Sequence, residues 1–296
     1  MGDETYIWSS KVNFKTAWCG SVDYYHQDYS TYKERGYPYM DMMNAFICLD
    51  SHGSYNAGLY VFGPEIFDSI RKVGKSPRGE YEITDALQSI ANDVKVLEYE
   101  GFWKDIGNPW DLITANENII ENIDEEMKGQ IEDNVTIKGK IYLGNNSVIK
   151  SGSCIEGNVW IGDNCTIGPN AYLRNGTVLC GENKIGASSE VKNSIMMFGA
   201  KAPHHNYVGD SIIGKESNLG SGTKIANLRL DKKIIEVTHN GKKIGTGRHK
   251  FGAIIGDHVN TGINASINAG TILGNNVKVG PNTLVSGTYE SNSIIV

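Results

Sequence analysis

Aliphatic residues recur at every sixth position through much of the second half of the chain. The first series has eleven members, all aliphatic or methionine: Ile137, Leu143, Ile149, Ile155, Ile161, Ile167, Leu173, Leu179, Ile185, Val191 and Met197. An amphipathic helix would repeat every ~3.6 residues and an ordinary strand every two. A period of six instead indicates one short flat strand and one turn per repeat, with the aliphatic side chain pointing inward.

The series stops twice and resumes twice further along the chain. The later members are Ile213, Leu219 and Ile225, and then Ile255, Thr261, Ile267, Leu273, Val279 and Val285. Three repeats close one triangular coil, so these steps predict a parallel β-helix of roughly seven coils, in which each coil buries its aliphatic face only against its neighbours. The fold class is therefore mainly β.

Two interruptions of the series are interpreted as loops ejected from the rod, which is where binding groups of a rigid scaffold usually lie. The first is FGAKAPHHNYVGDS, from Phe198 to Ser211, and it holds two adjacent histidines. The second runs from Asn227 to Phe251 and is rich in Lys and Arg. Within it, Asn240 and Gly241 stand between apolar alternations and predict a hairpin arm.

Composition narrows the classes of function. The 296 residues carry a net charge of −6, which argues against a nucleic-acid partner. The five cysteines form no CxxC pair, so we expect a reduced, cytoplasmic chain without a zinc knuckle. We also expect no membrane span and no signal peptide, because no apolar stretch is long enough and the N-terminus lacks a basic region before an apolar one.

Five blocks carry a family resemblance: GPNAYLR, KIGASSEVKNSIM, APHHNYVGDSIIG, NLGSGTKIANLRLD and GAIIGDHVNTGIN. They occur in order between Gly168 and Gly274, and this stretch resembles the acetyltransferase domain of archaeal bifunctional proteins. Those proteins join a sugar-1-phosphate nucleotidylyltransferase to a glucosamine-1-phosphate N-acetyltransferase of the hexapeptide-repeat acyltransferase family. The resemblance implies a left-handed β-helix, a homotrimer and acetyl-CoA as cosubstrate.

The same resemblance implies roles for individual residues. His204 would be the general base with Tyr207 as its partner, and His205 is the weaker second choice for the base. Arg174 and Lys192 would hold the phosphate. The remaining expected site residues are Asn218, Asn227 and Lys233 for the sugar or the acetyl acceptor, and the backbone amides near Gly220 and Ser221 for the thioester carbonyl.

Residues 56–112 resemble the end of the nucleotidylyltransferase domain of the same proteins, through NAGLYVFGPEIF, RGEYEITDAL and YEGFWKDIGNPWDL. The resemblance implies that Asn56 contacts the sugar and that Asp105 binds Mg²⁺. We expect a linker helix over 113–130 and the β-helix domain over 131–296. Residues 1–55 resemble nothing in the family and lack its glycine-rich phosphate loop, so we expect a truncated, degenerate or replaced domain and a lost nucleotidylyl transfer.

The predicted function is acetyl-CoA-dependent N-acetylation of glucosamine-1-phosphate, or of galactosamine-1-phosphate, in UDP-N-acetylglucosamine synthesis. The alternative is a UTP- and Mg²⁺-dependent nucleotidylyltransferase that uses the β-helix as a scaffold, and a purely structural β-helix is also open. A γ-class carbonic anhydrase would need a spaced set of three histidines, including an HxxxxH pair. The sequence has no such pair.

Overall fold

The computed structural model describes residues 45–49, 56–64, 66–91, 94–98, 102–239 and 241–296. It divides into two compact units. The described part of the first unit ends at Trp103, and the described part of the second begins at Lys104. The first unit has a three-stranded sheet in the order β2-β1-β3, in which β1 pairs antiparallel with β2 and parallel with β3. Its elements are β1 (Ala45–Leu49), β2 (Asn56–Phe62), α3 (Ile66–Lys72), α4 (Ile83–Ser89) and β3 (Val94–Glu98).

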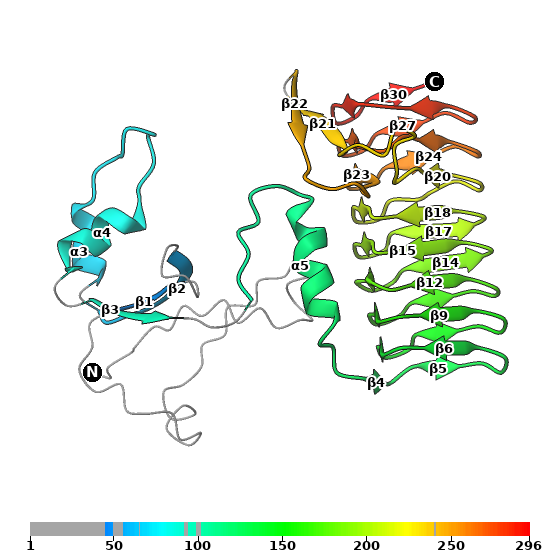
Figure 1. Cartoon of the computed structure of the whole chain (residues 1–296), viewed down its shortest axis with the longest axis horizontal. Helices are drawn as coiled ribbons and strands as arrows, with labels where there is room; N and C mark the ends of the chain where they lie inside the picture. The colour runs from blue at the N-terminus through cyan, green and yellow to red at the C-terminus, as the bar shows by residue number, and fades with distance from the viewer. Residues whose placement is uncertain (1–44, 50–55, 65, 92–93, 99–101, 240) are drawn as a thin grey trace. The chain divides into compact units, whose positions relative to one another are not determined.

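The second unit is a parallel β-helix, preceded by the helix α5 (Asp111–Ile120) (Figure 1). Successive coils place one strand in each of three sheets, and every pair of neighbouring strands in these sheets is parallel. The first sheet has nine strands, so the rod is longer than the seven coils predicted from the repeat. The undercount arose because coils at the start of the rod and within the first interruption escaped the six-residue series.

Each of the three sheets runs along one side of the rod. The first sheet holds β4 (Glu126–Met127), β7 (Ile141–Leu143), β10 (Val159–Ile161), β13 (Thr177–Leu179), β16 (Ile195–Met196), β19 (Ile212–Ile213), β23 (Ala253–Ile255), β26 (Thr271–Leu273) and β29 (Thr288–Tyr289). The second holds β5 (Gln130–Ile131), β8 (Val148–Ile149), β11 (Thr166–Ile167), β14 (Lys184–Ala187), β17 (Lys201–His204) and, beyond a bridge at Asn218, β24 (Asn260–Thr261), β27 (Lys278–Val279) and β30 (Ile294–Ile295). The third holds β6 (Thr136–Lys138), β9 (Cys154–Glu156), β12 (Tyr172–Arg174), β15 (Glu190–Lys192), β18 (Tyr207–Gly209), β20 (Lys224–Ile225), β25 (Ser266–Ile267) and β28 (Leu284–Val285).

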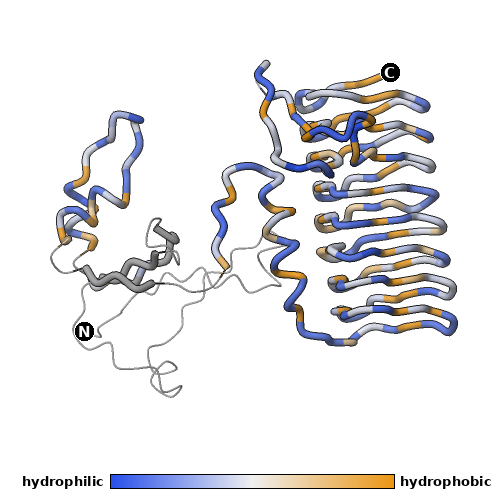
Figure 2. Tube along the Cα trace, viewed as in Figure 1, coloured by the Kyte–Doolittle hydropathy of each residue, from blue (hydrophilic) through white to orange (hydrophobic). Residues whose placement is uncertain are grey.

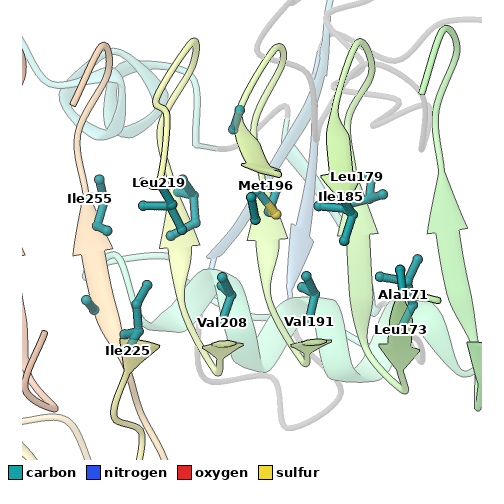
Figure 3. Packing of buried hydrophobic residues seen from close by; sticks show 14 of the residues in the cluster. Ala171, Leu173, Leu179, Ile185, Val191, Met196, Val208, Leu219, Ile225 and Ile255 are labelled. Carbon is teal, nitrogen blue, oxygen red and sulfur yellow. The ribbon is translucent and has the colours of Figure 1, made fainter. Parts of the chain in front are cut away.

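The core of the rod is a stack of the predicted aliphatic side chains. From Leu143 to Val191, every member of the first series is fully buried. Figure 2 shows hydrophobic positions returning at matching places in successive coils, and Figure 3 shows their side chains pointing into the rod. Each coil buries apolar area against the next, which stabilises the fold by roughly 25 cal/mol per Å² removed from water. The predicted β-helix is thus confirmed.

The prediction at Met197 is wrong, because Met196 is the residue that points inward. Its partner in the coil below is Leu179, seventeen residues earlier, whereas Ile161 lies eighteen residues before Leu179. This coil is therefore one residue shorter than the one before it, and the shortening occurs at the corner between the third and the first sheet. There the step from Val191 to the next inward residue is five instead of six.

The first interruption is therefore not an ejected loop, contrary to our expectation. Residues 198–211 instead form the second-sheet and third-sheet sides of one coil, whose strands β17 and β18 pair with β14 and β15. A second five-residue step follows, from Val208 to Ile213, both fully buried. Each shortening shifts a count of six out of phase by one residue, and this produces the apparent break in the pattern.

The second interruption does leave the rod as a hairpin arm, as the sequence predicts. Its strands β21 (Glu236–His239) and β22 (Lys242–Gly245) pair antiparallel. Phe251 donates its backbone N–H to the carbonyl of Asn227 at 3.0 Å, which closes the base of the arm. Ile235 and Val237 are each 1% exposed, so the arm packs one apolar edge instead of standing free in solvent.

The helix α5 packs against the outer face of the rod. Ile113 and Ile120 are fully buried, and the ring of Trp110 meets the edge of Phe251 with centroids 6.2 Å apart. The side-chain amide of Asn116 donates to the carbonyl of Gly176 at 2.6 Å. The helix is shorter than the predicted 113–130 segment, since the chain already enters the first coil at β4. In the part of the chain that is described, no helix has the length and apolar character to cross a membrane.

Candidate active site

The outer face of the third sheet gathers several of the predicted site residues. In-register pairing stacks Tyr172, Glu190, Tyr207 and Lys224 in one column across four coils. Neighbouring strands in such a sheet lie about 4.8 Å apart, so side chains of adjacent coils touch. Arg174 and Lys192 are two residues further along their strands, on the same face. The three predicted residues Arg174, Lys192 and Tyr207 therefore come together from three successive coils.

Arg174 is paired with a carboxylate that the sequence reasoning missed. Its guanidinium donates to Oε1 of Glu190 at 2.9 Å, and it lies 5.6 Å from the ring centroid of Tyr172. The hydrogen bond to Glu190 raises the pKa of Arg174, so the cation is held in place and charged. Glu190 could have been found from the sequence, because it precedes the inward Val191 by one residue in the block that contains Lys192.

Lys192 lies against a buried carboxylate, Asp210, which is the polar centre of the face. The Lys192 ammonium lies 3.1 Å from one Asp210 oxygen and 3.3 Å from the other. Asp210 is 1% exposed and also accepts hydrogen bonds from the side-chain amides of Asn193, at 2.8 Å, and of Asn227. A buried charge is tolerated only when it is paired and hydrogen-bonded in this way. Neither Asp210 nor Asn193 was predicted.

Tyr207 and Asn227 are packed closely beside each other. A Cβ placed on Gly209 would lie 2.7 Å from the Tyr207 hydroxyl and 2.6 Å from the Asn227 amide nitrogen. Only a residue without a side chain fits there. Burial raises the pKa of Tyr207, and the charges of Glu190 and Asp210 raise it further. The phenol is therefore a neutral hydrogen-bond donor near pH 7.

The predicted base, His204, is exposed at the end of β17, where the chain turns from the second to the third sheet. The turn is fixed by Asn206, whose side chain accepts from the His204 N–H at 3.0 Å and donates to the carbonyl of Gly220 at 2.8 Å. His205 is in the left-handed region, with φ of 51°. Its carbonyl accepts a hydrogen bond from the Lys224 ammonium. His204 thus belongs to a fixed corner, three residues before β18 begins at Tyr207.

The turn expected to face the thioester lies next to His204 but differs in detail from the prediction. The backbone N–H of Gly222 donates to the His204 carbonyl at 3.0 Å, which places the turn over that corner. The N–H of Gly220, however, is engaged by Thr261, with its hydroxyl at 2.9 Å and its carbonyl at 3.1 Å. Gly220 therefore cannot donate to a substrate carbonyl in this arrangement. The half-buried Ser221 is the remaining candidate of the two.

The other predicted residues lie further from this face. Asn218 bridges Lys201 and Asn260 in the second sheet. Lys233 is exposed on the arm, where its N–H donates to Oδ1 of Asp231 at 3.2 Å.

The nucleotidylyltransferase-like residues do not form a metal site in the described part of the chain. Asp105 is exposed, and no group of three or more His, Cys, Asp or Glu side chains converges among the described residues. Asn56 begins β2, but its side chain lies outside the described part. The described residues therefore do not fit a bound Mg²⁺.

Comparisons with known proteins cover both units. A nucleotidyl transferase family model matches residues 49–122, and a model for the hexapeptide repeat of succinyl-transferase matches residues 158–191 and 252–286. A bifunctional sugar-1-phosphate nucleotidylyltransferase/acetyltransferase of Sulfurisphaera tokodaii is 49% identical over 234 residues, covering 78% of this chain and 58% of that protein. A bifunctional protein GlmU of Methanococcus aeolicus is 44% identical over 242 residues, covering 81% of this chain and 59% of that protein.

A third relative is named as a nucleotidyltransferase. The low-salt glycan biosynthesis nucleotidyltransferase Agl11 of Haloferax volcanii is 38% identical over 167 residues, covering 55% of this chain and 46% of that protein. The chain thus spans less than two thirds of the length of each of these relatives. The resemblance read from the sequence blocks is confirmed: the chain is homologous to archaeal proteins named bifunctional sugar-1-phosphate nucleotidylyltransferase/acetyltransferase and GlmU, and hexapeptide repeats match within its β-helix.

Proposed function

We propose that the β-helix unit transfers the acetyl group of acetyl-CoA to the amine of a hexosamine 1-phosphate, either glucosamine-1-phosphate or galactosamine-1-phosphate. The observation that carries this proposal is the convergence of Arg174, Glu190, Lys192 and Tyr207 on one face of the third sheet, with His204 exposed three residues before Tyr207. The Sulfurisphaera tokodaii relative, a bifunctional sugar-1-phosphate nucleotidylyltransferase/acetyltransferase, supports the same chemistry.

The charges on this face match such a substrate. The guanidinium of Arg174 offers a planar donor pair to a phosphate, a geometry that favours bidentate binding. The carboxylate of Glu190 would attract the ammonium form of the substrate amine. Lys192 is 20% exposed and already paired with Asp210, so its share in phosphate binding would be mainly long-range attraction.

In the proposed reaction, His204 takes a proton from the substrate ammonium, and the free amine attacks the carbonyl carbon of acetyl-CoA. The new C–N bond forms as the C–S bond breaks, and CoA leaves as its thiolate. Tyr207 is a hydrogen-bond donor in this scheme, since its raised pKa keeps the phenol neutral. An amide donor to the developing oxyanion is worth roughly 3 kcal/mol, and Ser221 is the proposed source.

The test is release of free CoA thiol from acetyl-CoA in the presence of each amino-sugar phosphate. We expect His204→Ala to lower kcat by about 100-fold or more, the usual contribution of a general base near neutral pH. His205→Ala tests the weaker candidate in the same turn, and His258→Ala, at a distant exposed turn, is the control. An unchanged rate in His204→Ala would remove the assigned base.

Nucleotidylyl transfer is the second candidate, because the nucleotidyl transferase model matches residues 49–122. We predict that this activity is absent. Incubation with UTP, Mg²⁺ and N-acetylglucosamine-1-phosphate measures it, and steady release of pyrophosphate would overturn the prediction. A homotrimer, which the family resemblance implies, is likewise proposed, and sedimentation equilibrium measures it directly.

A further inference from the structure

One carboxylate on α5 connects the face of the third sheet with the arm. Glu117 accepts hydrogen bonds from two side chains that are far apart in the sequence, Arg248 and Asn193. Arg248 stands at the end of the arm, and Asn193 forms the corner beside Lys192. Glu117 itself belongs to the helix that precedes the rod, and the proposed reaction gives it no role.

The contact with Arg248 is bidentate. One guanidinium nitrogen donates to Glu117 Oε2 at 3.0 Å, and the other donates to Oε1. The same guanidinium also donates to the Thr114 hydroxyl at 3.1 Å, one turn earlier on α5. The Arg248 side chain is 18% exposed. Paired donors on a largely buried cation fix its orientation as well as its position.

Holding Arg248 also holds the base of the arm. The carbonyl of Arg248 accepts the N–H of Ile235 at 2.9 Å, and the N–H of Thr246 donates to the carbonyl of Ile235 at 3.0 Å. Lys233, the arm residue expected to bind substrate, is two residues before Ile235. The position of that lysine therefore depends on where Arg248 is anchored.

The second branch reaches the start of the arm. The Asn193 amide donates to Glu117 at 2.7 Å and to Asp210 at 2.8 Å. Asp210 in turn accepts from the side chain of Asn227, the residue at which the arm leaves the rod. Both ends of the arm are thus tied through short polar contacts to the single carboxylate of Glu117.

We infer that Glu117 is a positioning residue, which holds the base of the arm, and with it Lys233, in place for binding of the sugar phosphate. The inference rests on the proposed acetyl transfer for its consequence, but the anchoring of the arm can be measured without it. Glu117 acts through Arg248 and Asn193 and touches no substrate. Its loss should therefore weaken binding of the sugar phosphate and leave the chemical step intact.

The test is Glu117→Gln in the full chain, with two readouts. Glutamine can still accept from Asn193 but cannot pair with the guanidinium of Arg248. We expect hydrogen exchange at the amides of Ile235 and Thr246 to accelerate about tenfold, because the arm opens more often. We expect KM for the sugar phosphate to rise about tenfold, with kcat and KM for acetyl-CoA within about twofold of wild type.

Glu121→Gln is the matched control, since Glu121 is an exposed acid that follows the last turn of the same helix. It should leave both readouts unchanged. Unchanged exchange at Ile235 and Thr246 in Glu117→Gln would overturn the anchoring, and a fall in kcat without a rise in KM would overturn the positioning. If exchange accelerates while even the wild type acetylates no amino-sugar phosphate, the anchoring stands and the proposed function is what fails.

Discussion

The rod turns from its third to its first sheet in two different ways. Five of these corners contain a glycine with positive φ: Gly139, Gly157, Gly176, Gly270 and, in the last coil, Gly287. Two others, one above the next, contain Asn193 and Asp210 in the left-handed region, with φ of 45° and 49°. From one inward side chain to the next, the first four glycine corners have a step of six residues and the polar corners a step of five, while the last glycine corner has a step of four, from Val285 to Tyr289. The polar corners are the ones that border the candidate site.

The difference shows how a repeat can carry polar groups without damage to its core. Asn and Asp are the side chains that tolerate positive φ best after glycine, because they hydrogen-bond locally. At the shortened corners, these side chains are buried and meet Lys192, Asn227 and Glu117. The inward residues on either side stay fully buried. A glycine at this corner would avoid the backbone strain of positive φ, but it would offer no side chain to hydrogen-bond the residues of the face.

The largest effect on stability is expected from Asp210→Asn, which tests this comparison directly. The substitution keeps a residue suited to positive φ and removes only the charge. Lys192 would lose its counter-ion, and the new amide would face donors from Asn193 and Asn227. We expect the free energy of unfolding to fall by about 3 kcal/mol, the scale for breaking one side of a buried ion pair. Urea denaturation of the full chain measures this change.

Glu182→Gln is the control for Asp210→Asn. Glu182 is also an acid with positive φ, at 53°, but it is exposed. We expect its substitution to change the free energy of unfolding by less than about 0.5 kcal/mol. Equal effects of the two substitutions would mean that the charge of Asp210 has no special place in the polar corner.

A smaller effect is expected from Gly209→Ala, next to the second polar corner. The added methyl would meet the Tyr207 hydroxyl and the Asn227 amide at 2.7 and 2.6 Å, closer than real contacts allow. We expect a loss of about 2 kcal/mol in the free energy of unfolding, as in other overpacked sites. Gly245→Ala on the arm is the matched control, because its methyl would meet no atom within 4 Å. Similar stability of both variants would argue against tight packing around Tyr207.

The sequence predicts the rod well and its exceptions poorly, for a physical reason. The inward position is dictated locally, because each coil must bury one aliphatic residue per side, and so residues such as Ile155 and Leu173 could be placed from spacing alone. The five-residue steps hid the coil of His204, since a shift of one residue resembles the start of a loop. They could have been found by allowing Val191 to be followed by Met196.

The side-chain hydrogen bonds between distant residues could not be predicted from the sequence. Glu117 and Arg248 are 131 positions apart, and nothing in the local pattern around either residue indicates the other. The pairing of Asp210 with Lys192 likewise depends on the stacking of coils. The family resemblance supplied the expected roles of His204 and Tyr207, and those roles remain predictions.

The smallest expected effect concerns the alkaline side of stability and tests how closely Tyr207 is enclosed beside the polar corner. Burial, together with the charges of Glu190 and Asp210, raises the pKa of Tyr207 above the 10.0 of a free phenol. Above pH 10 the unfolded chain therefore releases this proton before the folded one does. Linkage then requires that the contribution of Tyr207 to stability is complete below pH 10 and is lost as the pH rises through the folded-state pKa.

Tyr207→Phe removes this proton and should therefore lose less stability than the wild type as the pH rises above about 10. Urea midpoints measured at intervals above that pH give the two slopes, and their difference isolates Tyr207 from the other tyrosines and lysines that titrate there. Parallel slopes would mean that the phenol ionises as freely in the folded chain as in water. The enclosure that separates this corner from the glycine corners would then not extend to Tyr207.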